Sequence, residues 1–232
     1  MEPDISRLAA LVTEPARAAI LLHLLDGRSW TAAELAKVAG VRASAASAHL
    51  KKLLDSDLIR VNPAGRHRYF RLAGAGVASL MEQLARSAPV RQAVTPGQRR
   101  ASLALRVCRL CYDHLAGRLG VEITAAMVSK SWLIEQEPWF QLTDMGAKQL
   151  AMLDVEPVTG RTCMDWSERR LHLAGALGTA IAESLIRKKF LLRDSKSRAL
   201  RVTDAGTEAI DAIFGIDARA CMRAEPAGEP VG

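Results

Sequence analysis

Five cysteine and histidine side chains in the second half of the chain could act as ligands. Cys108, Cys111 and His114 follow one another at intervals of three residues, so that neighbours can meet along one face of a helix. Cys163 and His172 lie further along. Thiolates and imidazoles are the ligands that soft metal and metalloid ions prefer. The sequence therefore offers a site for such an ion if the two groups converge.

The same residues have two other interpretations. Free cysteine is a common small core residue, and one Cys-x-x-Cys pair is a weak zinc signal. Aromatic rings in this half could line a cavity for a small organic effector, or fill a core. No cofactor follows from the sequence; a soft metal or metalloid ion and an organic effector remain the candidates. The candidate effector residues are Cys108, Cys111, Tyr112, His114, Trp132, Cys163, Trp166 and His172.

A sequence repeat relates the segment around His114 to the segment around His172. The residues H-L-A-G-R-L-G at 114–120 recur as H-L-A-G-A-L-G at 172–178, and L-T-D-M-G at 142–146 recurs as V-T-D-A-G at 202–206. Threonine and aspartate before an apolar-periodic stretch are typical of a helix start. Two matches in the same order predict a duplicated helix-strand-strand-helix module, which must position the candidate ligands.

The first half shows a different pattern. Apolar residues at helical spacing predict helices at 4–12 and 15–26, and Thr31 with Glu34 predicts a capping box for a short third helix. A longer helix starts at Ala43, and a leucine stripe (Leu50, Leu53, Leu54 and Leu58) marks its buried face. A last helix is expected at 76–86. Between these two helices, β runs at 58–61 and 67–72 are joined by N-P-A-G-R, which is typical of a hairpin.

This order of helix, turn, helix and basic hairpin is typical of a helix-turn-helix with a wing. A helix that enters the major groove needs small, hydrogen-bonding side chains where base edges crowd it, and cations nearby contact phosphates. A small-residue helix packed on a neighbour is the alternative, but three basic residues in a row on the hairpin disfavour it. The candidate DNA-contact residues are Arg42, Ser44, Ala45, Ser47, His49, Lys51, Lys52, Arg66, His67 and Arg68.

Residues 14–73 resemble the ArsR/SmtB family of dimeric winged-helix repressors. The resemblance is carried by P-x-R-x-x-I-L at 15–21, S-x-H-L-K-x-L at 47–53 and G-R-x-R-Y-F at 65–70. It implies a homodimer formed by the first and fifth helices, and binding to double-stranded operator DNA that a ligand relieves. The expected apolar seam is Leu8, Leu11, Leu80 and Leu84.

The chain departs from this family at both of its familiar metal sites. Residues 29–35 read S-W-T-A-A-E-L where the family has E-L-C-V-C-D-L, so both cysteine ligands are missing. The fifth helix offers only Glu82 where the other site needs aspartate, histidine and glutamate. We therefore expect an effector to be sensed in the second half.

Composition limits the remaining classes. The net charge of +7 and pI near 9.6 fit an acidic partner such as nucleic acid. Few cysteines and no leader favour the reducing cytoplasm, and the longest uncharged apolar stretch, Ala18–Leu25, is too short to span a membrane. No Gly-rich phosphate loop, nucleophile elbow or two-histidine metal helix is present, so no enzymatic activity is expected.

The expected fold is mainly α with short β hairpins: a winged helix-turn-helix domain followed by an α+β domain. The expected divisions are a DNA-binding and dimerisation domain at 1–88, a linker at 89–98, a duplicated effector domain at 99–216 and a flexible tail at 217–232.

The expected function is a sequence-specific transcriptional regulator of repressor type, controlled by an effector in the second domain. One alternative is an architectural DNA-binding protein without an effector. The other is a redox- or metal-sensing regulator that uses Cys108, Cys111 and Cys163.

Overall fold

The computed structural model describes residues 2–89, 96–195 and 197–223. The chain divides into two compact units, Met1–Gln83 and Leu84–Gly232. The boundary falls inside a helix, α5 (Ala75–Ser87), rather than at the expected residue 88. Each unit is described by itself.

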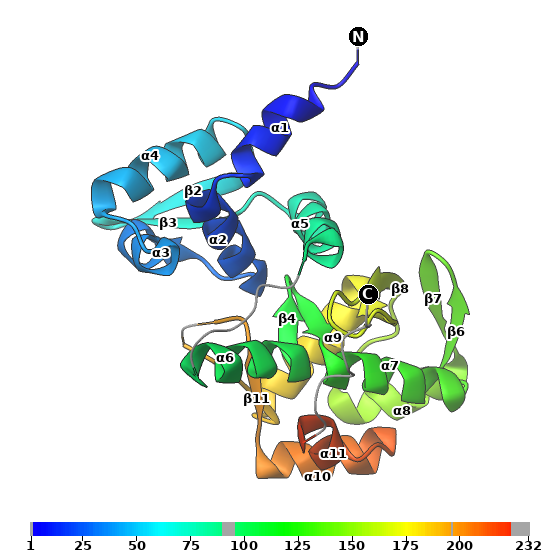
Figure 1. Ribbon diagram of the computed structural model, residues 1–232. Coiled ribbons are helices and arrows are strands. Elements are labelled where there is room, and N and C mark those ends of the chain that lie inside the picture. Colours follow the sequence, from blue (N-terminus) through cyan, green and yellow to red (C-terminus); the bar gives the residue numbers. More distant parts are fainter. Residues whose placement is uncertain (1, 90–95, 196, 224–232) are drawn as a thin grey trace. The chain divides into compact units, whose positions relative to one another are not determined.

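The helices of the first unit follow the predicted pattern (Figure 1). Pro15 begins the second helix. Gly27, after the 3-10 turn that continues this helix, and Gly40, after the third helix, both have the left-handed conformation that is typical of a helix end. The predicted capping box is confirmed: Glu34 N–H donates to Thr31 Oγ1, and the Glu34 carboxylate accepts from Thr31 N–H at 2.8 Å. The elements are α1 (Ile5–Val12), α2 (Pro15–His23), η1 (Leu24–Asp26), α3 (Ala32–Ala39), α4 (Ala43–Leu54) and α5.

A three-stranded antiparallel sheet completes this unit, in the order β1-β3-β2. The hairpin of β2 (Ile59–Ala64) and β3 (His67–Leu72) is the predicted wing. Its register pairs Ala64 with His67, so Gly65-Arg66 alone forms the turn, which is tighter than the predicted five-residue connection. Strand β1 (Trp30–Thr31) pairs with β3 and was not predicted, because two residues carry no period.

Apolar side chains from these elements form the core of the first unit. Leu50 and Leu53 of α4 are buried, as predicted. The guanidinium of Arg17 on α2 donates to the carbonyl oxygens of Ala10 and Leu11, each at 2.7 Å, and so holds the end of α1 against α2. Further buried members are Ile20, Leu21, Leu35, Phe70 and Leu72.

The helices of the described residues are short. None of the single helices there is both long and apolar enough to cross a bilayer. The consecutive segments Ile5–Val12 and Pro15–Asp26 reach that length and composition only as a pair, which is bent by 84°.

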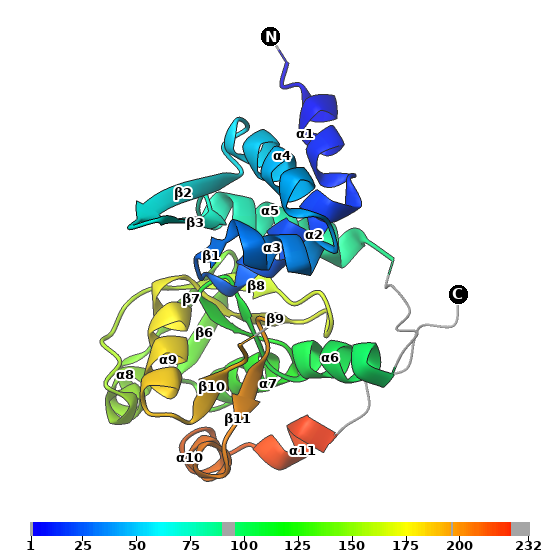
Figure 2. The ribbon, with the colours of Figure 1, turned by 90° about the vertical axis from the view of Figure 1, so that its left-hand side faces the viewer.

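The second unit mixes helices with short antiparallel strands, as predicted (Figure 2). Strands β6 to β9 form one four-stranded sheet, and β4-β5 and β10-β11 are separate hairpins. The elements are α6 (Pro96–Val107), β4 (Arg109–Cys111), β5 (His114–Ala116), α7 (Arg118–Ser129), β6 (Leu133–Gln136), β7 (Trp139–Leu142), α8 (Asp144–Leu150), η2 (Ala151–Leu153), β8 (Gly160–Met164), β9 (Leu171–Ala174), α9 (Gly175–Arg187), β10 (Leu191–Arg193), β11 (Leu200–Val202), α10 (Asp204–Phe214) and α11 (Ala218–Arg223).

The element order of the second unit matches the predicted module twice. Helix, strand, strand and helix follow one another as α7-β6-β7-α8 and again as α9-β10-β11-α10. Thr143 and Thr203 cap α8 and α10 by accepting a hydrogen bond from Gly146 N–H and Gly206 N–H, respectively. A hairpin precedes each copy, β4-β5 before the first and β8-β9 before the second. This order agrees with a duplication, which stays a prediction.

The two copies are interleaved. Strand β7 of the first copy pairs with β8, while Leu200 N–H, at the start of β11 in the second copy, donates to Cys108 O just before β4. Helix α9 packs against β5, and α7 packs against β9, where Thr124 Oγ1 accepts from Leu173 N–H at 2.9 Å. The hairpin before each copy therefore packs against the helix of the other.

The folded region of the second unit extends beyond the predicted limit. Helix α11 buries Ala218 and Cys221, and Arg118 on α7 donates to Cys221 O at 3.2 Å. The prediction of a flexible tail was therefore wrong for Ala218–Arg223, because apolar side chains there join the core. At the predicted linker, α6 already begins at Pro96. Residues 90–95 and 224–232 lie outside the described residues.

Candidate functional site

Helix α4 presents a thin, polar face to solvent. Ser44 and Ser47 are exposed, whereas Ala46 between them is fully buried. Ser47 Oγ donates to Ala43 O at 3.0 Å, which keeps this short side chain close to its own helix. Small residues therefore cover the face opposite the leucine stripe, as predicted for a helix that approaches another polymer closely.

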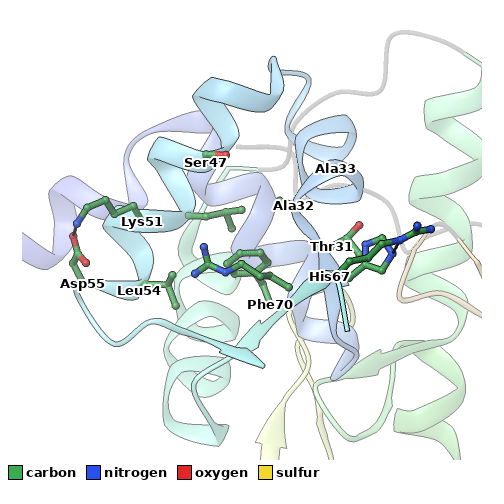
Figure 3. A pocket seen from close by; sticks show the side chains of 12 residues that line it. Thr31, Ala32, Ala33, Ser47, Lys51, Leu54, Asp55, His67 and Phe70 are labelled. Carbon is green, nitrogen blue, oxygen red and sulfur yellow. Dashed lines mark hydrogen bonds and ion pairs between the residues drawn. The ribbon is translucent and has the colours of Figure 1, made fainter. Parts of the chain in front are cut away.

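This face opens onto a groove of about 820 Å³ (Figure 3). Ser47 and Lys51 of α4 line one part of it, and Thr31 lies with His67 of the wing at another. The small side chains of Ala32 and Ala33 at the start of α3 also line the groove, although the sequence did not mark them as site residues. Helices α3 and α4 and the wing thus surround one cleft in the first unit.

Basic side chains surround the groove. Arg66 and His67 are exposed at the tip of the wing, and Arg68 lies over the Phe70 ring with its guanidinium 5.6 Å from the centroid. Lys51 Nζ pairs with an Asp55 carboxylate oxygen on the next turn at 2.7 Å. This pair is exposed, so a phosphate can compete for the lysine at little cost. Arg42 and Lys52 are also exposed.

His49 differs from the other predicted contacts. Its Nδ1 lies 3.5 Å from Nη1 of the buried Arg17, so one edge of the ring is turned towards α2. The ring is half-buried, as is Ala45. His49 therefore helps to seat α4 on the core, and only its remaining edge is available to a ligand.

Cysteine and histidine side chains converge in the second unit, but not along a helix. Cys111 and His114 are register partners in the β4-β5 hairpin, and Cys163 and His172 are register partners in β8-β9. The prediction that Cys108, Cys111 and His114 share a helix face was wrong. The chain leaves α6 at Val107 and turns back after Cys111.

The four hairpin side chains form one group, which we call the Cys-His cluster: Cys111, His114, Cys163 and His172. The sulfur atoms of the two cysteines are 4.0 Å apart, and the Nε2 atoms of the two histidines are 3.1 Å apart. One ligand atom from each residue lies within 4.8 Å of all the others. Cys163 is half-buried and the other three are buried. Cys108 is not in the group; it is packed in the core.

Burial sets the protonation of the cluster. The hydrogen bond between Cys111 and Cys163, together with burial, raises the pKa of Cys111 to about 12. Burial lowers the pKa of His172. For His114, burial acts in the same direction, whereas the hydrogen bond to the Asp113 carboxylate acts to raise the pKa. Without a bound cation, Cys111 is therefore a neutral thiol at pH 7.

A buried ion pair lies behind the cluster. Arg109 Nη2 and Asp165 Oδ2 are 2.9 Å apart, and both side chains are fully buried. Asp165 also accepts from Gly117 N–H at 2.7 Å, and its carboxylate lies 3.9 Å from His172 Nδ1. Burial alone would raise the pKa of Asp165, but the Arg109 guanidinium holds that pKa well below its ordinary value. The sequence did not identify this pair.

The repeated glycines explain the repeated motif. Gly117, just before α7, and Gly175, the first residue of α9, have φ of +79° and +70°, a region that favours glycine. A side chain at Gly117 would also place its Cβ 2.7 Å from Arg106 O. The H-L-A-G pattern therefore turns each ligand strand sharply into its helix.

The predicted aromatic residues lie against different partners. Trp132 is buried against Phe214, with ring centroids 6.1 Å apart. Trp166 lies under the Arg109 guanidinium, 4.7 Å from its ring centroid. Tyr112 occupies the turn of the β4-β5 hairpin with φ of +63°. An aromatic effector pocket stays a prediction.

The chain is similar to known regulators. Residues 12–62 match the model of a helix-turn-helix domain family. A protein of Bacillus subtilis (strain 168), the uncharacterized HTH-type transcriptional regulator YdfF, is 37% identical over 219 residues, covering 91% of this chain and 97% of that protein.

Solved structures are similar over a smaller part of the chain. The homodimeric winged helix-turn-helix domain of Mb0332 from Mycobacterium bovis is 28% identical, covers 34% of this chain and 73% of its own, and has a TM-score of 0.32. The cadmium sensor CMTR from Mycobacterium tuberculosis is 28% identical and has a TM-score of 0.32. That match covers 39% of this chain and 94% of CMTR.

Proposed function

The chain belongs to the ArsR/SmtB family of winged helix-turn-helix transcriptional regulators, and we propose that it is a sequence-specific, operator-binding repressor. In this proposal an effector that binds the second unit changes how much of the operator DNA is occupied. It is a regulator rather than an enzyme, and its partner is double-stranded operator DNA.

The groove beside α4 carries the proposal. Its lining includes small side chains such as Ser47 and basic side chains such as Lys51, together with the apolar side chains of Leu50, Leu54 and Phe70. Major-groove recognition needs both features, because base edges require close approach and phosphates require positive charge. In this proposal Ser44, Ser47 and the free edge of His49 read bases, while Lys51, Arg66 and Arg68 contact phosphates.

A C2 dimer is the proposed assembly. One recognition helix makes few contacts, and two-fold pairing doubles them across half-sites. Helix α1 supports this: it has no buried residue within one chain, and its Ile5 side chain is 74% exposed. Leu84 of α5 is also 40% exposed. The proposed seam is Leu8, Leu11, Leu80 and Leu84.

The proposal of an effector in the second unit rests on two observations. The stretch at the start of α3 and helix α5 lack the ligands of the family's familiar metal sites. The second unit, in contrast, brings thiols and imidazoles together in the Cys-His cluster. An architectural DNA-binding protein without an effector would not need such a cluster.

Footprinting on the DNA upstream of the protein's own gene tests the proposal. A specific dimeric regulator is expected to protect two half-sites about 10–10.5 bp apart, centre to centre, at protein concentrations that leave a scrambled duplex unprotected. Uniform protection of both duplexes would indicate an architectural binder and overturn the proposal.

A further inference from the structure

We infer that the Cys-His cluster binds one thiophilic metal ion of the Zn²⁺ type in a tetrahedral Cys2His2 site. The ligand atoms are the sulfurs of Cys111 and Cys163 and the Nε2 atoms of His114 and His172. This deepens the proposed function, because it gives the effector a chemical class; ion binding itself does not depend on DNA binding.

The distances within the cluster suit such an ion. Tetrahedral bonds of about 2.0–2.1 Å to nitrogen and about 2.3 Å to sulfur place the two nitrogens about 3.3 Å apart and the two sulfurs about 3.8 Å apart. The observed separations are 3.1 Å between the Nε2 atoms and 4.0 Å between the Sγ atoms. These two separations agree with a tetrahedral ligand set to within a few tenths of an ångström, and the sulfur and nitrogen atoms all lie within 4.8 Å of one another.

The hydrogen bonds of the two imidazoles point to the same ligand. Asp113 accepts from His114 Nδ1 at 3.0 Å, so a neutral His114, the form that binds a metal ion, directs the lone pair of its Nε2 atom at His172 Nε2. His172 is 1% exposed, and its Nδ1 has no hydrogen-bond partner among the described residues. If the His172 proton is on Nε2, Nδ1 is a buried acceptor without a donor. If it is on Nδ1, two lone pairs face each other. A cation between the Nε2 atoms removes this conflict.

Carboxylates stand behind both imidazoles. Asp113 lies at Nδ1 of His114, and Asp165 lies 3.9 Å from Nδ1 of His172. Histidine ligands of metal ions characteristically direct their other nitrogen at a carboxylate, which fixes the tautomer and orients the ring. His114 makes this hydrogen bond, and at His172 a carboxylate lies nearby without a hydrogen bond to Nδ1.

Charge and access also suit a divalent thiophilic ion. When the ion binds, it replaces the two thiol protons, which leave to solvent, and two thiolates neutralise its charge. A neutral site is compatible with burial, and half-buried Cys163 gives a route of entry. Four protein ligands leave no open position, which is typical of a structural or sensory site rather than a catalytic one. The ion would tie the β4-β5 hairpin to β8-β9.

Titration of the full-length, reduced protein with Co²⁺ tests the assignment. We expect one equivalent to produce the visible bands of tetrahedral Co²⁺ and the near-ultraviolet thiolate charge-transfer band, and one equivalent of Zn²⁺ to remove both. Octahedral, weakly absorbing Co²⁺ would overturn the assignment. So would a Cys111–Cys163 disulfide that forms readily in a protein that takes up no metal after reduction.

Variants identify the ligands. Cys163→Ser and His172→Asn are expected to lose tight binding, whereas Cys108→Ser, which changes a buried cysteine outside the cluster, is expected to keep it. Asp113→Asn changes a half-exposed side chain, and is expected to weaken Zn²⁺ binding about 10–100-fold. Circular dichroism without metal verifies folding. Parent-like Zn²⁺ affinity in folded Cys163→Ser and Asp113→Asn would contradict the assignment.

A second measurement separates the site from the proposed function. Operator affinity is compared with and without one equivalent of Zn²⁺. A change in affinity that Cys163→Ser abolishes and Cys108→Ser retains supports the ion as effector. The tetrahedral Co²⁺ spectrum with unchanged operator affinity would overturn its role as effector while the site stands.

Discussion

The Nε2 atoms of His114 and His172 lie 3.1 Å apart, although 58 positions separate the two residues in the chain. Each histidine begins the same H-L-A-G motif, and each pairs with a cysteine across its own hairpin. The repeat therefore brings two equivalent Cys-His pairs face to face in the second unit.

The Arg109–Asp165 pair is expected to stabilise this arrangement. Asp165→Asn keeps the side-chain shape but leaves the Arg109 charge buried without its partner, so it should lower the free energy of unfolding by about 3–5 kcal/mol. Urea denaturation in the presence of a chelator measures the change. Asp154→Asn, which removes an exposed carboxylate paired with Lys188, is the matched control and should change little. Equal effects of the two substitutions would contradict the account.

The capping box of α3 gives a stability prediction with a pH dependence. Thr31→Ala is expected to cost about 1 kcal/mol near pH 7, because it removes the cap from Glu34 N–H and a donor to the Glu34 carboxylate. The Thr31 hydroxyl lowers the pKa of Glu34 below its ordinary 4.5. Stability linked to a lowered pKa is present above 4.5 and lost as the pH falls through the folded value. The loss in free energy of unfolding that Thr31→Ala causes should therefore become smaller below pH 4.5, as measured by denaturant titration. Thr13→Ala, at an exposed threonine whose hydroxyl donates to Ala10 O rather than to a carboxylate, is the control. A cost of Thr31→Ala that does not change with pH would contradict the expectation.

The elements around the proposed DNA groove could be predicted because their signals are local. The signals are a capping box, a leucine stripe and the N-P-A-G-R connection, each contained within a few residues, and they predicted α3, α4 and the wing. The groove lining at Ala32 and Ala33 could not be predicted, because it depends on how the wing folds back onto α3.

The Cys-His cluster could be predicted only in part. Intervals of three residues suggested a helix, but three-residue strands around a Tyr112-Asp113 turn have no recognisable period. Cys163 and His172 are nine positions apart and become neighbours through strand register, which is a non-local property. The histidine repeated at 114 and 172 was the signal that linked the two hairpins of the cluster. No sequence pattern marked Asp113 and Asp165, whose carboxylates lie behind the imidazoles.

Arg68 is expected to contribute charge but no sequence preference. Arg68→Ala should weaken binding to all duplexes alike and lower the slope of log affinity against log salt by about one unit, because one phosphate contact is lost. Fluorescence anisotropy at several salt concentrations measures the slope. Arg201→Ala, an exposed arginine on β11, should leave it unchanged. A selective loss on the operator alone would assign Arg68 to base recognition instead.

The dimer seam is tested at Leu84, which is 40% exposed on α5. Leu84→Asp places a charge in the proposed interface and should give a monomer at micromolar concentration in sedimentation velocity. Operator affinity should fall by at least about tenfold, or 1.4 kcal/mol. Ile134→Asp, at an apolar side chain 45% exposed on β6, should leave the mass and affinity unchanged. A monomeric parent protein with DNA present would exclude the dimer.

Ser47 tests most directly whether α4 reads DNA sequence. The parent protein should bind an operator duplex at least about 10³-fold more tightly than a scrambled duplex at the same salt concentration. Ser47→Glu places a carboxylate against the base edges and should abolish this preference, whereas Ser129→Glu, with the same change on the exposed end of α7, should retain it. Competition anisotropy with both duplexes measures the ratio. Loss of the ratio in Ser47→Glu alone is the predicted result, and operator binding by Ser47→Glu as tight as that of the parent would contradict the account.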